Sequence, residues 1–338
     1  MKQAITINKD PRDMNRESSL CLQLTEAGEL RHLLTLEGLD RSIIENLLDR
    51  SEEYRHPIGS VPARDTCLAG RTVANLFFEA STRTRASFEL AAKRMSADVL
   101  NLDVNTSSRI KGESILDTIY TLQAMQADIF VIRDASAGVP ALIAEHVQPH
   151  ISILNAGEAD ISHPTQGLLD LLTIRQHKGG FEGLVVTIIG DIKHSRVARS
   201  AAQGLRTMGT TDLRLATPPG LAPDPLHYPG AVITEDVDAA IEGADVVMAL
   251  RIQRERIENN PRLPDKNKYL EIYGVTEKRL QLARPDAIVM HPGPMNRDVE
   301  IVGSVADGPQ SVITEQVANG LAVRMAILAT ISEPRANS

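Results

Sequence analysis

The chain alternates short apolar runs with stretches of helical spacing, and this alternation predicts strands connected by helices. In the N-terminal half we expect strands at residues 73–78, 98–102, 129–133 and 151–154, and helices at 33–54, 83–95, 113–125 and 140–147. A second series follows, with strands at 184–189, 213–216, 232–233, 246–250 and 287–290 and a helix at 196–208. Apolar strands separated by helices are typical of a parallel sheet covered on both faces. The pattern therefore predicts an α/β fold of two doubly wound parallel-sheet domains joined by long helices.

The length of 338 residues also favours two domains. Residues 1–29 are polar and weakly patterned, so we expect a flexible N-terminal extension there. The first domain is predicted at 30–165 and the second at 166–315, with a bridging helix at 163–177. The segment 316–332 carries little polarity, which predicts a largely buried closing helix, and we expect residues 316–338 to pack back on the first domain.

Composition narrows the class of protein. Hydrophobic residues make up 42% of the chain while aromatic residues make up 3%, so the cores are expected to be aliphatic. The net charge of −8 argues against a nucleic-acid-binding surface. The 2 cysteines are too few for a disulfide framework or a cysteine zinc site. A long apolar run and a signal peptide are both missing, and the sequence therefore predicts a cytoplasmic protein in a reducing compartment.

The most informative stretch is residues 77–95, FFEASTRTRASFELAAKRM, where a strand turns into a helix. The first turn of a helix offers unpaired N–H groups and the positive end of the dipole, which suits an anion. The hydroxyls of residues 81–84 add donors, and the guanidinium groups of Arg83 and Arg85 suit a phosphate. A glycine-rich cradle is absent. Taken alone, the stretch fits a phosphate site and equally fits a plain Ser81 N-cap with surface arginines.

Polar residues also follow several other predicted strands, where open parallel sheets bind their ligands. They are Arg133, residues 163–166 (HPTQ), residues 191–196 (DIKHSR), Arg251 with Gln253, and residues 291–294 (HPGP). The set lacks an acid pair, HExxH, GxSxG and GxGxxG. These groups predict a site that holds anions and polarises a carbonyl without a metal or a covalent nucleophile. Transfer of an acyl-like group between two anionic substrates would suit such a site.

Six motifs in order carry a family resemblance across residues 30–328: STRTRASFE, KGES, HPTQ, GDIKHSR, RIQRER and MHPGPMNR. Together they resemble the aspartate carbamoyltransferase (aspartate transcarbamoylase) catalytic chains, in particular the bacterial type with an N-terminal extension. The resemblance implies the aspartate/ornithine carbamoyltransferase fold. It also implies transfer of the carbamoyl group of carbamoyl phosphate to L-aspartate in de novo pyrimidine biosynthesis, without a cofactor or a metal.

The resemblance also implies roles for the donor side of the site. The phosphate of carbamoyl phosphate would be held by Ser81, Thr82, Arg83 and Thr84. The carbonyl oxygen would be polarised by Thr84, Arg133 and His163. The carbamoyl NH2 would be held by Gln166 and the backbone carbonyl of Pro294. Gly293 belongs to the same loop and stands where the family commonly has Leu.

On the acceptor side, Arg196 and Arg251 would clamp the two aspartate carboxylates, with Gln253 assisting. Ser107 would reach carbamoyl phosphate and Lys111 would reach both substrates, from a neighbouring subunit. This implies a homotrimer with shared active sites, with regulatory or dihydroorotase-like chains as possible further partners. The residues alone leave open whether the 105–112 loop serves its own site or a neighbour's.

Two alternatives remain beside this interpretation. An ornithine carbamoyltransferase would need an acidic partner for the ornithine ammonium and commonly has Cys in the late motif, whereas residues 291–294 contain none. Glu79 and the positive charge of Arg251 fit the aspartate pattern better. A non-catalytic relative on the same fold should have lost site residues, and every matched position here is intact.

Overall fold

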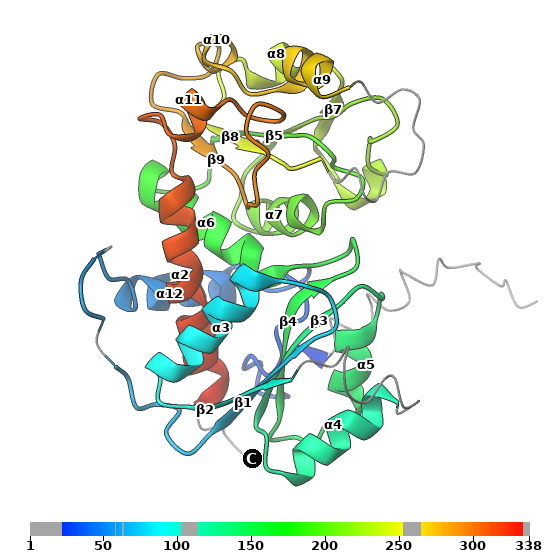
Figure 1. Cartoon of the computed structure of the whole chain (residues 1–338), viewed down its shortest axis with the longest axis vertical. Helices are drawn as coiled ribbons and strands as arrows, with labels where there is room; N and C mark the ends of the chain where they lie inside the picture. Colours follow the sequence, from blue (N-terminus) through cyan, green and yellow to red (C-terminus); the bar gives the residue numbers. More distant parts are fainter. Residues whose placement is uncertain (1–21, 58, 63, 103–113, 253–264, 334–338) are drawn as a thin grey trace, which may run out of the picture.

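The computed structural model of the chain describes residues 22–57, 59–62, 64–102, 114–252 and 265–333. Within these ranges the strands form two parallel sheets, and helices pack against both (Figure 1). The prediction of two α/β domains with parallel sheets is confirmed.

The first sheet has the strand order β2-β1-β3-β4, and all its neighbouring strands are parallel. The strands are β1 (Thr72–Phe77), β2 (Asp98–Leu102), β3 (Ile129–Asp134) and β4 (Ser152–Glu158). The accompanying helices are α3 (Thr82–Arg94), α4 (Ile115–Ala124) and α5 (Val139–His146). The strand order reverses between β1 and β3, so a crevice opens at their carboxyl ends.

The second sheet has the order β7-β6-β5-β8-β9, again parallel throughout. Its strands are β5 (Val185–Ile189), β6 (Asp212–Ala216), β7 (Val232–Thr234), β8 (Val246–Ala249) and β9 (Ile288–Met290). Its helices are α7 (Arg196–Thr207), η2 (Pro225–His227), α8 (Val237–Ile241), α9 (Lys266–Tyr273), α10 (Glu277–Leu280) and α11 (Gly303–Ala306). Here the order reverses between β5 and β8, which creates a second crevice.

Three further helices are α2 (Arg41–Glu53), α6 (Pro164–Lys178) and α12 (Ile313–Ser332). Figure 1 shows α6 between the two sheet regions, with the long α12 beside it. Every residue of α6 from Pro164 to Ile174 is buried, which explains why its apolar positions do not follow one face. The closing helix α12 packs against α2, α3 and α6, and it is largely buried as predicted.

The helix expected at 33–54 begins only at Arg41, so that part of the prediction is wrong. The preceding residues are extended along β4, where the Leu33 N–H donates to the Ile153 carbonyl over 2.9 Å. The Leu33 carbonyl accepts from the Asn155 N–H, also over 2.9 Å. Pairing with the sheet edge therefore satisfies this backbone while its leucines remain in the core.

The predicted extension also includes a folded part, because residues 22–29 pack on the first sheet region. Gln23 is 1% exposed, and its Oε1 accepts hydrogen bonds from the N–H groups of Leu34 and Thr35 at 2.7 and 2.9 Å. The expectation of a flexible arm is wrong for residues 22–29, and residues 1–21 lie outside the described part of the chain.

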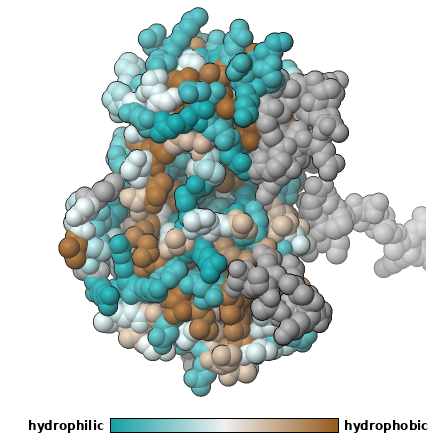
Figure 2. Space-filling model, in the orientation of Figure 1, coloured by the Kyte–Doolittle hydropathy of each residue, from teal (hydrophilic) through white to brown (hydrophobic). Residues whose placement is uncertain are grey.

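The visible surface is mostly polar. Figure 2 shows hydrophilic residues over most of this face, with smaller apolar patches between them. None of the helices in the described ranges combines the length and the apolar character that a membrane span requires.

Candidate active site

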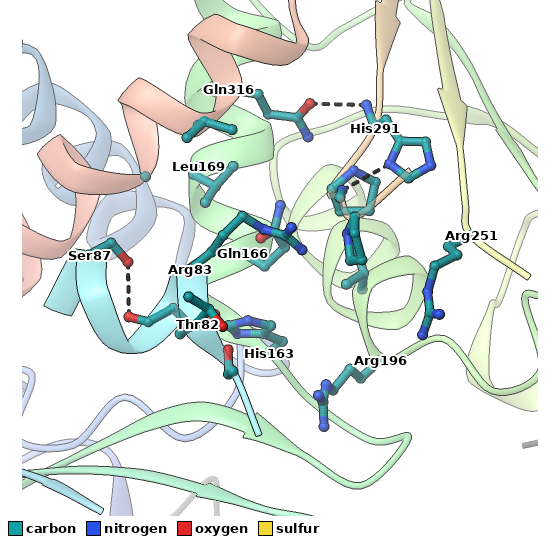
Figure 3. Close-up of a pocket in the computed structure, with 18 of the residues that line it drawn as sticks. Thr82, Arg83, Ser87, His163, Gln166, Leu169, Arg196, Arg251, His291 and Gln316 are labelled. Carbon is teal, nitrogen blue, oxygen red and sulfur yellow. Dashed lines mark hydrogen bonds between the residues drawn. The ribbon is translucent and has the colours of Figure 1, made fainter. Parts of the chain in front are cut away.

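A cavity of about 570 Å³ lies between the two sheet regions. The first sheet region contributes the end of β1, the start of α3 and the end of β3 to its walls. The second sheet region contributes the start of α7, the segment after β8 and the loop after β9. The helices α6 and α12 complete the walls. Figure 3 shows Arg83, His163 and Gln166 pointing into the same space as Arg196 and Arg251. Both crevices created by the strand orders therefore open into one cavity.

The start of α3 forms one wall of this cavity. Ser81 is the N-cap residue, but its side chain makes no capping hydrogen bond, so the first N–H groups of the helix remain available for an anion. Thr84 is buried in the first turn, and its carbonyl accepts from Ser87 Oγ at 2.9 Å. The local geometry is what an anion site at a helix N-terminus requires.

The Glu79 carboxylate lies between two arginines from different sheet regions. Arg196 on α7 donates to it through Nη1 at 2.8 Å and Nη2 at 3.0 Å, which is a bidentate pair. Arg133 at the end of β3 donates to the same carboxylate at 3.1 Å. The two guanidinium groups also donate to backbone carbonyls, that of Ala156 from Arg133 and that of Ala159 from Arg196. Glu79 thus holds the first sheet region to α7.

A glycine makes room for this arginine pair. Gly157 has a φ of +127°, and a Cβ there would lie 3.0 Å from Arg133 Nη1 and 3.1 Å from Arg196 Cζ. Any larger residue would strain the backbone and push the guanidinium groups away from their partners. The glycine is therefore part of the geometry of the site.

His163 is buried where α6 begins. Its backbone N–H donates to Ser200 Oγ at 2.8 Å, while its Nδ1 has no hydrogen-bond partner within the described ranges. Burial lowers the pKa of His163 well below its usual value, and the nearby charges of Arg133, Arg196 and Arg324 lower it further. The imidazole is therefore neutral near pH 7.

Arg83 and Arg251 face the cavity from opposite sheet regions. Burial lowers the pKa of Arg83, and the positive charge of Arg251 lowers it further. The Arg83 guanidinium also lies against Gly293, where a Cβ would be 3.3 Å from its Cζ and where φ is +64°. Glycine, in place of the leucine that the family resemblance leads us to expect, thus lets Arg83 approach the loop backbone.

A buried chain of hydrogen bonds lies behind Gln166, and we call this chain the relay. Its Nε2 donates to Asp170 Oδ1 at 2.9 Å, and Gln316 Nε2 donates to the same oxygen at 2.6 Å. Gln316 Oε1 in turn accepts from the His291 N–H at 3.1 Å (Figure 3). Burial raises the pKa of Asp170 to about 7. The relay joins α6, α12 and the loop after β9.

Arg324 on α12 is a further cation on the cavity wall. It is 4% exposed, its Nη1 donates to the Gly320 carbonyl at 2.7 Å, and its guanidinium lies 5.1 Å from the ring centre of Phe88. Burial lowers its pKa to about 10. With Arg324 the lining contains five arginines and, among the described residues, one carboxylate, so the cavity attracts anions.

The structure brings most of the predicted site residues together. Those that line the cavity are Ser81, Thr82, Arg83, Thr84, Arg133, His163, Gln166, Arg196, Arg251, Gly293 and Pro294. Ser107, Lys111 and Gln253 lie outside the described residues, so their roles stay predictions.

Three residues around the cavity were not predicted from the sequence: Asp170, Gln316 and Arg324. Asp170 and Arg324 are charged residues inside apolar helical runs, LLDLL and LAVRMAIL, and that signal could have identified them. Three or more potential metal ligands are nowhere grouped in the part of the chain that is described.

Comparison with known families identifies the fold. The model of the aspartate/ornithine carbamoyltransferase carbamoyl-P binding domain matches residues 31–176, and the model of the Asp/Orn binding domain of the same family matches residues 182–331. The chain belongs to the aspartate/ornithine carbamoyltransferase family. Each matched region of this carbamoyltransferase contains one of the two sheets, so the family fold expected from the motifs is confirmed.

Solved structures of both branches of the family resemble this carbamoyltransferase. Aspartate transcarbamoylase from Trypanosoma cruzi, in complex with aspartate and phosphate, is 30% identical with a TM-score of 0.77, over 92% of this chain and 97% of the other. Ornithine carbamoyltransferase from Thermus thermophilus is 26% identical with a TM-score of 0.79, over 90% and 99%. The ornithine carbamoyltransferase from Pyrococcus furiosus is 27% identical with a TM-score of 0.78, over 89% and 96%. These similarities support carbamoyl transfer and do not distinguish aspartate from ornithine as the acceptor amine.

Proposed function

We propose that this carbamoyltransferase uses L-aspartate as the acceptor, giving N-carbamoyl-L-aspartate and phosphate. The observation that carries the proposal is the bidentate pair of Arg196 with Glu79. It places a guanidinium in the cavity in the geometry in which an arginine receives a carboxylate. Arg251 supplies a second guanidinium on the same wall, so two carboxylates of one substrate would each have a partner.

The donor side fits carbamoyl phosphate. The uncapped first turn of α3, with Ser81, Thr82, Arg83 and Thr84, would bind the phosphate. Thr84, Arg133 and neutral His163 would donate to the carbonyl oxygen and stabilise the oxyanion that forms when the amine attacks. Gln166 and the Pro294 carbonyl would accept from the carbamoyl NH2.

In the reaction the protein then has two tasks, which are to position the two substrates and to balance their negative charges. The neutral amine of aspartate forms a C–N bond to the carbamoyl carbon, the C–O bond to phosphate breaks, and the departing phosphate accepts the amine proton. Holding two anions against their mutual repulsion is the main task, and the arginines of the cavity supply it. Carbamoyl phosphate binding first would lower the repulsion between Arg83 and Arg251 before aspartate enters.

Ornithine is the alternative acceptor, because a solved ornithine carbamoyltransferase has a TM-score to this chain similar to that of an aspartate enzyme, 0.79 against 0.77. An ornithine ammonium needs an anionic partner. In the described lining Glu79 is the single carboxylate, and it already pairs with Arg133 and Arg196. The charge balance of the cavity therefore favours a dicarboxylate.

The wider context is part of the same proposal. Carbamoylation of aspartate would place the enzyme in de novo pyrimidine biosynthesis in the cytoplasm. A homotrimer would bring Ser107 and Lys111 of one subunit to the site of the next. Light scattering on the purified protein tests the trimer, and a monomeric mass would contradict it. Regulatory or dihydroorotase-like partner chains would show as larger assemblies in the native host.

The deciding experiment follows the ureido product from carbamoyl phosphate with L-aspartate and, separately, with L-ornithine. We expect product with aspartate and none above background with ornithine. Product with ornithine alone would overturn the acceptor assignment and keep the family activity. Folded protein that gives no product with either amine would contradict the proposed function.

A further inference from the structure

The relay behind Gln166 centres on a carboxyl group that does not line the cavity. Asp170 lies one helical turn after Gln166 on α6 and is 1% exposed. Its Oδ1 accepts from the side-chain amides of both Gln166 and Gln316, while its Oδ2 has no partner within the described ranges. Nothing in the proposed chemistry uses Asp170 directly, so its two hydrogen bonds need another explanation.

The direction of each hydrogen bond follows from the backbone. The His291 N–H can only donate, so it fixes the oxygen of the Gln316 amide on its side at 3.1 Å. The Gln316 Nε2 must then face Asp170, as observed at 2.6 Å. Asp170 Oδ1 is therefore an acceptor, and Gln166 also turns its Nε2 toward it. A flipped Gln166 would place oxygen against oxygen in a buried site, which is unfavourable.

With its nitrogen held by Asp170, Gln166 presents Oε1 as the free end of the amide on the cavity wall. The other branch of the relay fixes the loop that contains Pro294. His291 Nδ1 accepts from the Gly293 N–H at 2.9 Å, and the opposite ring nitrogen lies 3.2 Å from Glu300 Oε1. Hydrogen bonds thus hold the loop on both sides of its histidine, and Pro294 of this loop lines the same cavity.

We infer that Asp170 is a positioning residue that selects carbamoyl phosphate over acetyl phosphate by aiming Gln166 Oε1 and the Pro294 carbonyl at one NH2 group. Both oxygens are acceptors, and a carbamoyl NH2 has two N–H donors to offer them. The methyl group of acetyl phosphate has the same shape but donates nothing, so it would leave both acceptor oxygens without a hydrogen-bond donor. The inference rests on carbamoyl phosphate as the donor in the proposed function and does not depend on which amine accepts.

Asp170 can accept both hydrogen bonds in either protonation state, because a neutral carboxyl protonated on Oδ2 still accepts at Oδ1. An asparagine whose oxygen takes the Oδ1 position would keep the two hydrogen bonds. Asp170→Asn is therefore the conservative variant, and Asp170→Ala removes the acceptor. Asn319→Ala is a matched control, because Asn319 makes buried hydrogen bonds across the same α6–α12 contact, to Thr173 and Gln176, and does not line the cavity.

The test measures kcat/KM for carbamoyl phosphate and for acetyl phosphate, the latter as a substrate or, where turnover is too slow, as a competitive inhibitor. Asp170→Ala is expected to lower kcat/KM for carbamoyl phosphate roughly 10- to 100-fold, as misplaced reacting groups do, while acetyl phosphate changes less than about threefold. Asp170→Asn should restore most of the loss, and Asn319→Ala should leave the preference between the two phosphates unchanged. Thermal unfolding of each variant checks its fold.

A second variant tests the inference if Asp170→Ala does not fold. Gln316→Met cuts the branch to the loop and leaves the Gln166–Asp170 bond in place, so the preference for carbamoyl phosphate should fall by less than in Asp170→Ala. Equal losses on both phosphates in the folded variants would overturn the positioning role. A wild-type protein that binds neither phosphate in calorimetry would instead refute the proposed donor, which separates the two failures.

Discussion

The donor and acceptor sides of the cavity are built differently. On the donor side, the proposed phosphate site is one continuous stretch, in which the strand β1, the turn and the first residues of α3 follow one another along the chain, while Arg133 and His163 come from other elements of the first sheet region. The acceptor side joins Arg196 at the start of α7 with Arg251 after β8, more than fifty residues apart. A continuous segment leaves its mark in the sequence as a motif, whereas a site assembled across a sheet is visible only once the strand order is known.

The two sides also differ in what they hold. The first N–H groups of α3 are not capped by Ser81, so the donor side is ready for an anion. The acceptor arginine Arg196 already has a carboxylate partner in Glu79. An incoming substrate carboxylate must therefore compete with, or rearrange, an existing ion pair on the acceptor side. Variants on each side should consequently separate the two substrates kinetically.

The largest effect is expected on the donor side, from Arg133→Ala. Loss of one donor to the developing oxyanion lowers kcat by about 100- to 1,000-fold, because the charge develops only in the transition state. Steady-state rates at saturating concentrations of both substrates measure it. The control is Arg71→Ala, which removes a half-exposed surface arginine of the same sheet region and should change kcat less than twofold. A comparable loss in both variants would contradict a catalytic role for Arg133.

On the acceptor side, Arg196→Ala should raise the KM for aspartate by roughly 100-fold, since a charged hydrogen-bonded pair in a buried site contributes about 2–3 kcal/mol. The affinity for carbamoyl phosphate should change little, and calorimetry with that ligand alone checks it. Arg206→Ala, on the exposed side of the same helix, is the control. If carbamoyl phosphate binding falls as far as aspartate binding does, the division into two sides is wrong.

The smallest expected effect is a change in the free energy of unfolding with pH, and it arises from His163 on the donor side. Burial lowers the pKa of His163, so the folded protein keeps this group neutral while the unfolded chain binds a proton near pH 6.5. The free energy of unfolding should therefore fall as the pH drops below about 6.5, with His163 contributing up to about 1.4 kcal/mol per pH unit. Urea unfolding at pH 7.5, 6.5 and 5.5 measures this slope. His163→Asn should flatten it, whereas replacing the exposed His150 by Gln should not.

The regular elements were largely predictable because their apolar runs are long and buried. All nine predicted strands have counterparts among the described residues, although β4 extends further, to Glu158. The failure at residues 33–40 has a physical reason. Leucines spaced for a helix also suit an extended segment whose backbone pairs with β4, and the sequence does not show that pairing. The short helices α8 to α11 have too few turns to give a clear period.

The site was predictable where chemistry is concentrated in motifs and less so where it depends on packing. Arg83, His163 and Arg196 were found because they lie in motifs at strand ends, and the cavity brings them together. Asp170 and Arg324 were missed because they lie inside buried helices, where sequence patterns indicate core residues. Their partners come from other elements, so their importance follows from the tertiary structure alone.

The meeting of two sheet crevices in one cavity has a consequence for how such enzymes diversify. In the proposed assignment, most groups for carbamoyl phosphate come from the first sheet region, and the arginines for the amine substrate, Arg196 and Arg251, come from the second. Substitutions on the second sheet can then change the acceptor while leaving the activation of carbamoyl phosphate intact. Solved relatives that use either amine are similar to this chain, at 26% and 30% identity, and both share its two-domain arrangement.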